Sequence, residues 1–139
     1  MKRAFTALAA SALCVTLSIS ALAHGDGAPQ PVDTTGLEKL GDDWRDTNPY
    51  KGNETAIRIG ASGYNSNCAR CHGLEVKSGG IAPDLRYLEE DPDGDQWYLN
   101  RVRKGRIHNG ATKMPPFEGL ISQEAMWAIR TYIDAQPED

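Results

Sequence analysis

Apolar residues recur at helical spacing from Glu54 onward. Gly60, Tyr64 and Cys68 occupy positions i, i+4 and i+8, so they lie on one face of a helix. Ile57 lies beside this face. The pattern therefore predicts a helix that begins near Glu54 and continues to about Cys68.

A second helix is predicted at the C-terminal end of the chain. Ser122 is a good N-cap residue, and the residues after it form one apolar stripe at helical spacing: Met126, Ile129, Tyr132 and Ile133. A shorter helix is expected over residues 97–104. No segment alternates between apolar and polar residues for long enough to predict a strand, and no internal repeat is visible. The predicted fold class is all-α.

Two stretches are rich in turn-forming residues. Residues 24–53 contain many Gly, Pro, Asp and Asn residues and few apolar ones, which predicts an extended arm that lies on a core built elsewhere. Residues 89–95 are expected to form an acidic turn. The last five of them, Asp91–Asp95, are similar to the start of a calcium-binding loop but lack its distal Glu, so calcium binding stays open as an alternative.

The first 23 residues have the features of a signal peptide. Two basic residues precede an apolar run over residues 4–22, and residues 21–23 fit the small-x-small pattern of a signal peptidase site. We expect cleavage after Ala23 and a periplasmic protein. The run is too short and too rich in Ser and Thr for stable membrane insertion. Lipid attachment at Cys14 is an alternative, but Leu13 stands where such sites need a small residue.

Length and charge narrow the function further. The 139 residues suit one small domain, and 15 basic and 19 acidic residues give a formal charge of −4. Residues 1–23 hold two basic residues and no acidic ones, so their removal leaves 116 residues with a charge of −6. This balance argues against binding to nucleic acid or to anionic membrane surfaces.

The sequence Cys68-Ala69-Arg70-Cys71-His72 carries the strongest chemical signal. Two thiols at this spacing can each add to a vinyl group of one porphyrin, and the next His is then held under the iron as an axial ligand. This attachment is made outside the cytoplasm, so the preceding signal peptide makes the interpretation more specific. The prediction is one covalently bound haem c. A redox dithiol, which would need a βαβ context, and a structural zinc site are the alternatives.

An iron with one protein ligand needs a second ligand on its other face. Met114 is preferred because the two prolines after it hold the segment extended, so that its thioether can point across a flat ring. Met126 falls on the apolar stripe of the last helix, where a core role suffices. His108 and His24 are the other candidates. With His72 and Met114 bound, no iron position remains for oxygen or peroxide, so we expect an electron carrier and not an enzyme.

Other residues are expected around the cofactor. A ligating His donates its second ring N–H to a carbonyl or carboxylate, and the Pro83 turn is suited to present its carbonyl to His72. Leu85 would pack on the ring. Trp97 is either a hydrogen-bond donor to a haem propionate or a core residue. Arg101 is either a partner of a propionate or a solvated side chain.

These residues resemble a class I cytochrome c. The resemblance rests on Gly60 and Tyr64, on Cys68–Gly73, on Ala82–Leu85, on Met114–Phe117, and on Trp127 and Tyr132. It covers about residues 54–135 and implies a single haem enclosed by three to five helices and loops, with the first and last helices crossing near Gly60. Residues 54–139 are then the cytochrome c domain, and the extended arm precedes it.

The arm takes part in a closer resemblance, to cytochromes of the c-550 type (PedF-type). It rests on residues 47–53, 67–75, 78–86 and 121–124, so it covers nearly the whole mature chain. This family accepts electrons from periplasmic alcohol dehydrogenases that use pyrroloquinoline quinone. The resemblance implies an alcohol (ethanol) dehydrogenase as donor, and a terminal oxidase or another cytochrome of the respiratory chain as acceptor.

Three functions stay open on these residues. The first is a diffusible electron shuttle, in which a basic run either docks an acidic partner or is solvated: Arg101, Arg103, Lys104, Arg106 and Lys113. The second is a fixed electron-transfer subunit of another oxidoreductase, with the arm as its tether. The third is an enzyme or gas sensor, which needs an iron with an open position.

Overall fold

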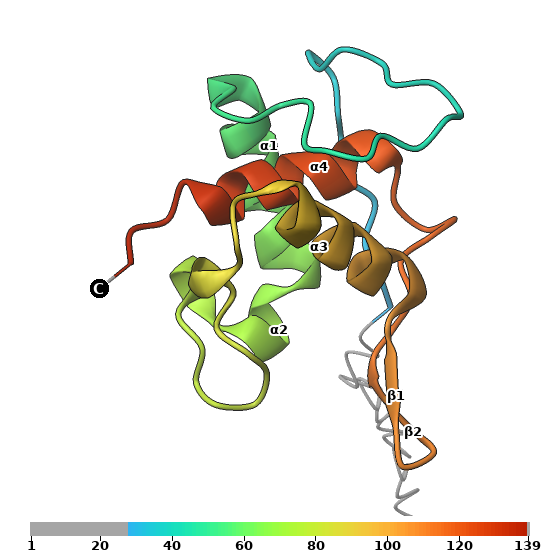
Figure 1. The fold of residues 1–139 in the computed structure, drawn as a ribbon, viewed down its shortest axis with the longest axis vertical. Helices are drawn as coiled ribbons and strands as arrows, with labels where there is room; N and C mark the ends of the chain where they lie inside the picture. The colour runs from blue at the N-terminus through green and yellow to red at the C-terminus, as the bar shows by residue number, and fades with distance from the viewer. Residues whose placement is uncertain (1–27, 139) are drawn as a thin grey trace, which may run out of the picture.

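The computed structural model describes residues 28–138, so the predicted signal peptide and His24 lie outside the described residues. In chain order the elements are α1 (Glu54–Asn67), α2 (Ala69–His72), the 3-10 helices η1 (Leu74–Val76) and η2 (Leu85–Tyr87), α3 (Pro92–Lys104), the strands β1 (Arg106–His108) and β2 (Ala111–Met114), and α4 (Gln123–Asp134). This part of the chain is mostly helical, as predicted, and adds one small two-stranded sheet (Figure 1). None of the described helices is long and apolar enough to cross a membrane.

Helices α1 and α4 cross in close contact at the centre of the fold (Figure 1). At the crossing Gly60 is buried, and a Cβ atom there would lie 1.9 Å from the carbonyl oxygen of Ala128. The rings of Tyr64 and Tyr132 pack beside the crossing with centroids 5.4 Å apart. The predicted face of α1 and the predicted stripe of α4 are confirmed, because these two surfaces meet in the core.

Both of these helices begin at a capping side chain. The Asn53 side chain accepts a hydrogen bond from the Ala56 N–H, and the Ser122 side chain accepts one from the Ala125 N–H. Each cap satisfies an N–H group that has no partner within its helix. The start of α4 therefore agrees with the prediction made from Ser122.

Helix α3 begins five residues before its predicted start. The Asp91 side chain accepts a hydrogen bond from the Gly94 N–H, and Pro92 fits the first helical position because it needs no N–H partner. The prediction of an acidic turn through residue 95 is therefore wrong from residue 92 onward. Asp91 serves as a cap and Asp95 is buried beside Arg130, so two carboxylates of the calcium-like sequence already have structural partners.

A buried ion network joins α3, α4 and the arm. Arg130 is fully buried, and its Nε lies 3.1 Å from Asp95 Oδ1 and 3.2 Å from Asp134 Oδ1. Asp95 Oδ2 accepts a hydrogen bond from the Asn48 N–H at 2.8 Å. Burial raises the pKa of Asp134 to about 6, although the positive charge of Arg130 acts in the opposite direction. The network thus fixes three segments that are distant in sequence.

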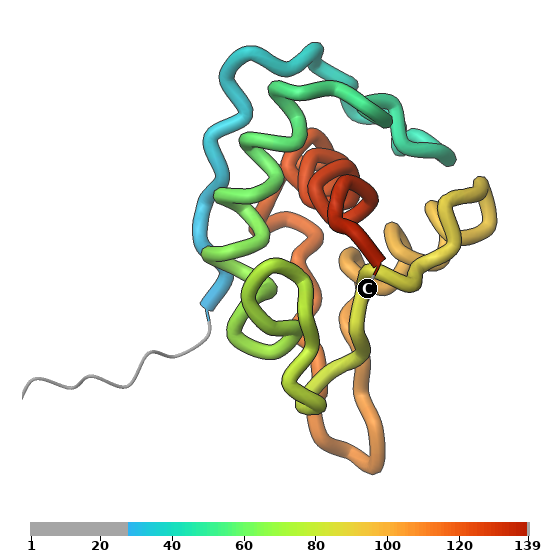
Figure 2. The backbone as a smooth tube through the Cα atoms, turned by 90° about the vertical axis from the view of Figure 1, so that its left-hand side faces the viewer, coloured from blue at the N-terminus to red at the C-terminus, as the bar shows by residue number. Residues whose placement is uncertain are grey.

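The arm, residues 28–53, contains no helix or strand and runs along α1 before it turns over the fold (Figure 2). Side chains at the start of α4 hold its backbone: Glu124 accepts from the Leu40 N–H at 3.1 Å, and Gln123 accepts from the Arg45 N–H at 2.7 Å. Three arm residues are buried with the core: Leu37, Leu40 and Tyr50. The arm therefore completes the core in addition to covering it.

One hairpin in the described residues differs from the sequence prediction. Strands β1 and β2 are antiparallel, with His108 opposite Ala111. Asn109 and Gly110 form the turn, and both have positive φ, as a two-residue hairpin with an Asn-Gly turn requires. The strands are short and almost wholly exposed, so they show no apolar alternation. The prediction that no segment is a strand is wrong at this position.

We expect Gly60→Ala to destabilise the protein by about 3 kcal/mol, because the new Cβ would meet the backbone of α4. In an unconstrained helix the same change would stabilise by about 1 kcal/mol, so the sign of the effect reports on the crossing. Unfolding by urea measures the difference. Gly79→Ala is the matched control, since its new Cβ would have no neighbour within 4 Å. Equal stability of the two variants would contradict a close crossing.

Candidate functional site

The residues predicted to surround the cofactor line one cleft of about 310 Å³. The cleft lies between α2, α3, the hairpin and the loop before η2. Its wall includes all of the predicted site residues: Cys68, Cys71, His72, Pro83, Leu85, Trp97, Arg101 and Met114. These residues come from four separate segments of the chain, so it is the tertiary fold that brings them together.

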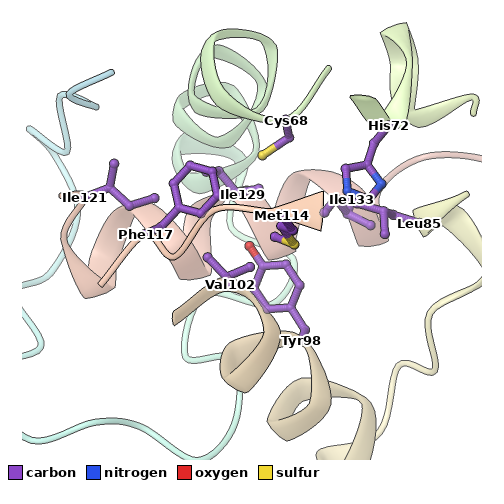
Figure 3. Close-up of a pocket in the computed structure, with 10 residues that line it drawn as sticks. All are labelled: Cys68, His72, Leu85, Tyr98, Val102, Met114, Phe117, Ile121, Ile129 and Ile133. Carbon is purple, nitrogen blue, oxygen red and sulfur yellow. The ribbon is translucent and has the colours of Figure 1, made fainter. Parts of the chain in front are cut away.

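The inner end of the cleft is apolar (Figure 3). Ile129 and Ile133 of α4 line it, together with Val102 of α3. The Tyr98 hydroxyl donates a hydrogen bond to the Met126 carbonyl at 2.8 Å, so this buried polar group is satisfied. The sequence pattern placed none of these side chains at the site. The i, i+4 spacing of Tyr98 and Val102 on α3 is the signal that could have placed those two.

Helix α2 follows α1 directly, and the turn between them sets the position of His72. The Cys68 N–H donates to the Tyr64 carbonyl at 2.7 Å, and the His72 N–H donates to the Cys68 carbonyl at 3.0 Å. Gly73 then turns the chain with a φ of 86°, where a Cβ atom would lie 1.8 Å from the Lys77 oxygen. The Tyr64 hydroxyl donates to the Gly73 carbonyl at 2.8 Å. Helix α1 therefore anchors both ends of the motif.

The His72 ring points into the cleft (Figure 3). Its Nδ1 lies 2.8 Å from the Pro83 carbonyl oxygen, as the sequence predicts. Because a carbonyl can only accept, Nδ1 carries the hydrogen, and in the neutral ring Nε2 therefore keeps a free lone pair. This is the state in which an imidazole binds a metal.

A carboxylate holds the loop that presents the Pro83 carbonyl. Asp84 accepts hydrogen bonds from the Ser78 N–H at 3.3 Å, from the Arg86 N–H at 3.1 Å and from the Arg86 guanidinium at 3.0 Å. The hydrogen bonds from Arg86 lower the pKa of Asp84 to about 2. The Ser78 hydroxyl also donates to the Ala82 carbonyl. Because the carboxylate stays ionised at neutral pH, the loop keeps its shape there.

The two thiols of the motif are not joined in a disulfide. Burial raises the pKa of the Cys68 thiol to about 12, whereas a redox-active dithiol needs a lowered thiol pKa. The redox alternative is therefore disfavoured. Within residues 28–138 no three His, Cys, Asp or Glu side chains come together in a group that could hold a metal ion. The zinc alternative thus has no ligand set in the described part of the chain.

Met114 ends strand β2 and is half-buried in the cleft wall. The segment after it is tied to α3, since the Phe117 N–H donates to the Val102 carbonyl at 3.0 Å. Gly105 permits the close approach of this segment, because a Cβ atom there would lie 2.4 Å from the Met114 oxygen. Met126, in contrast, is fully buried in α4 and is absent from the cleft wall. The structure thus favours Met114 over Met126 as a residue that reaches the cofactor.

Trp97, Arg101 and His108 lie at the outer part of the cleft. The Trp97 side chain is 48% exposed, so the alternative that it is a core residue is wrong. The Arg101 guanidinium lies 5.2 Å from the centroid of the Trp97 ring and donates to the Gly105 carbonyl at 3.3 Å. His108 is exposed on β1. The mouth of the cleft therefore offers indole and guanidinium N–H donors.

The donor set of the cleft fits a c-type haem. The cleft wall offers two thiols, an imidazole with a free lone pair and a thioether around an apolar interior, which are the groups that attach and ligate such a haem. Among the described residues no Asp or Glu lines the cleft, so none of their carboxylates there would repel the propionates. The residues present therefore suit the predicted cofactor.

Comparison with known proteins points to the same cofactor. The family model described as cytochrome c oxidase, cbb3-type, subunit III matches residues 55–133, more than half of the chain. Cytochrome c550 of Pseudomonas aeruginosa is 58% identical over 125 residues, which make up 87% of this chain and 86% of that protein. The chain belongs to the cytochrome c family. The predicted c-550 type is confirmed, the cofactor is covalently bound haem c, and the protein is an electron-carrying cytochrome.

Two further similarities involve a larger protein. The quinohemoprotein alcohol dehydrogenase ADH-IIG of Pseudomonas putida is 36% identical over 92 residues, which make up 66% of this cytochrome and 12% of that enzyme. A solved structure of ADHIIG from Pseudomonas putida HK5 matches with a TM-score of 0.50 and 33% identity, over 70% of this cytochrome and 14% of that chain. The cytochrome thus resembles a small part of a much longer enzyme.

Proposed function

We propose that this cytochrome carries single electrons in the periplasm from a pyrroloquinoline quinone-dependent alcohol (ethanol) dehydrogenase to the respiratory chain. The observation that carries the proposal is the cleft, in which an imidazole of fixed tautomer and a thioether reach one apolar interior. The acceptor is a terminal oxidase or another cytochrome. Residues 1–23 are the export signal, residues 24–53 the arm, and residues 54–139 the cytochrome c domain.

His72 and Met114 are the axial ligands in this proposal, and Cys68 and Cys71 are the attachment points. The bound haem supplies an iron that gains and loses one electron. With these two side chains bound to the iron, no position would be left for oxygen or peroxide, which would suit a carrier and not an oxidase or sensor. The Pro83 carbonyl keeps the His72 ring in one orientation, because the hydrogen bond to Nδ1 prevents rotation.

Three more residues receive roles in the proposal. Leu85 is buried in the cleft wall, from where it would pack on the face of the porphyrin. Trp97 and Arg101 are the partners of the propionates, since both place N–H donors at the mouth of the cleft. A charge-assisted hydrogen bond from Arg101 would be the stronger of the two contacts.

The donor is proposed from the relatives. The name of ADH-IIG combines a quinone, a haem and alcohol oxidation, and one part of that enzyme resembles this cytochrome. A quinone-dependent dehydrogenase that lacks such a part needs a separate carrier of the same type. A cytochrome of the c-550 type with an export signal meets that need.

A fixed subunit of another oxidoreductase is the second candidate, because the matching family model is named for a subunit of the cbb3-type oxidase. The arm was the expected tether in that case. Its backbone, however, is held by Gln123 and Glu124 of the same chain, and Leu37 and Leu40 are buried in the core. An arm packed in this way is not available as a tether, which favours the free carrier.

In the reduced protein we expect Met114→Ala to open one iron position, so that this variant binds carbon monoxide and the wild type does not. Optical difference spectra measure the binding. Met126→Leu is the matched control, and we expect it to bind no carbon monoxide. Carbon monoxide binding by the wild type would contradict a firm Met114 ligand. If Met114→Ala does not bind carbon monoxide, a double variant that combines it with His108→Ala tests whether His108 has replaced Met114 as the second iron ligand.

The proposed donor is tested by stopped-flow reduction of the oxidised protein with a pyrroloquinoline quinone alcohol dehydrogenase and ethanol. We expect fast, saturable reduction whose rate falls as salt is added, because the docking is between charged surfaces. Ascorbate is the control for a reducible haem. Slow reduction by the dehydrogenase together with normal reduction by ascorbate would remove this donor and leave the carrier without an assigned partner.

A further inference from the structure

The hairpin formed by β1 and β2 projects from the body of the molecule in both views (Figures 1 and 2). Its residues are exposed except for Met114, which is half-buried at its base. Asn109 and Gly110 close it with the backbone of a tight two-residue turn, so it has a defined shape. Within residues 28–138 no third strand pairs with either strand of this hairpin. A projecting element that ends on a proposed iron ligand is well placed to be contacted from outside.

Large apolar side chains are exposed on the segments around the cleft. The three with the highest exposed fractions in the described residues are Ile81, Leu74 and Ile107, at 82%, 74% and 73%. Ile107 lies in the middle of β1, while Ile81 lines the cleft from the loop after His72. Single exposed apolar residues are common on protein surfaces. Here the three most exposed ones lie either in residues 74–81, which follow His72 closely in sequence, or on the hairpin.

Charge is also unevenly distributed. Residues 97–114 contain five basic residues and no acidic one, whereas residues 89–95 contain five acidic residues and no basic one. The two groups lie toward opposite ends of α3, which agrees with the direction of its helix dipole. The basic end is the end that leads into the hairpin. A chain with an overall charge of −4 therefore presents a positive region at its cleft.

The structure separates the basic residues of this region by role. Arg103 makes two hydrogen bonds to Glu118, at 2.9 and 3.0 Å, and its guanidinium lies 4.0 Å from the centroid of the Trp44 ring. It therefore serves the packing of the fold. Arg106, His108 and Lys113 line the cleft from the hairpin, and no described contact ties their side chains to an acidic group.

We propose that the hairpin, with Ile107 as an apolar anchor and Arg106 and Lys113 as its cationic rim, is the docking surface for the electron-transfer partner. This inference rests on the proposed function as a carrier. The partner surface that fits is a small apolar socket ringed by carboxylates. The cations speed and orient the encounter, while one apolar contact holds the complex only briefly, as a carrier with fast turnover requires.

The test uses a surface of known chemistry in place of the unidentified partner. Gold electrodes are coated with carboxylate-terminated alkanethiols, either alone or mixed with methyl-terminated ones, and adsorption of the haem-loaded protein is measured by voltammetry. The variants are Arg106→Glu with Lys113→Glu, and separately Ile107→Ser. The controls are Arg58→Glu with Lys39→Glu, which changes the net charge equally, and Leu120→Ser, at an apolar residue that is 55% exposed elsewhere.

On both coatings, at low salt, we expect the Arg106 and Lys113 double variant to lose at least about tenfold in adsorption relative to its charge-matched control. Ile107→Ser is expected to lose about fivefold on the mixed coating and little on the pure carboxylate coating, because only the mixed coating offers an apolar contact. Unchanged haem spectra and reduction by ascorbate show that each variant is folded. Equal adsorption of the hairpin variants and their controls would overturn the docking surface.

The same variants are then reduced by the alcohol dehydrogenase, so that the two proposals can fail separately. If the electrode results are as expected and the dehydrogenase does not reduce the wild type, the docking surface is supported and the dehydrogenase is excluded as the donor. If the dehydrogenase reduces the wild type and the hairpin variants equally fast, the dehydrogenase is supported as the donor and the hairpin is excluded as the docking surface. A dimer of the wild type that the hairpin variants no longer form would assign the surface to a second copy of the chain, and this would also overturn the proposal.

Discussion

The close crossing of α1 and α4 at Gly60 places two walls of the cofactor cleft relative to each other. Because no side chain separates the helices there, α4 lies directly against α1. The C-terminal end of α1 then leads into the Cys68–His72 motif, while the same α4 supplies Ile129 and Ile133 to the inner wall of the cleft. A larger residue at the crossing would move these two walls apart. The width of the cofactor cleft is therefore set by a glycine that does not line it.

A second group of contacts makes the site rigid, which is what an electron carrier needs, since its geometry should change little when the charge on the iron changes. The Pro83 carbonyl orients the His72 ring, and Asp84 holds the loop that contains this carbonyl. On the other side, the hydrogen bond from Phe117 to α3 holds the segment that follows Met114. None of these contacts involves the arm, whose backbone is held by Gln123 and Glu124 at the start of α4.

The sequence was informative wherever the signal is local. The spacing of the haem motif, the cap at Ser122 and the stripe on α4 are each contained in a few residues, and the Pro83 turn adjoins the residue it serves. The start of α3 at Asp91 and Pro92 was also readable, but the surrounding acidic run obscured it. The hairpin was missed because its strands are short and exposed, so they leave no periodic pattern. The pairing of Arg130 with Asp95 depends on which helices meet, and a single sequence does not contain that information.

The proposed function requires one haem in this cleft, with an imidazole and a thioether as the axial ligands of its iron. X-ray absorption at the iron edge of the purified protein, in both oxidation states, tests this ligand set. We expect six-coordinate iron with five nitrogen neighbours and one sulfur, and the same neighbours after reduction. A five-coordinate iron, or six nitrogen neighbours with no sulfur, would contradict it.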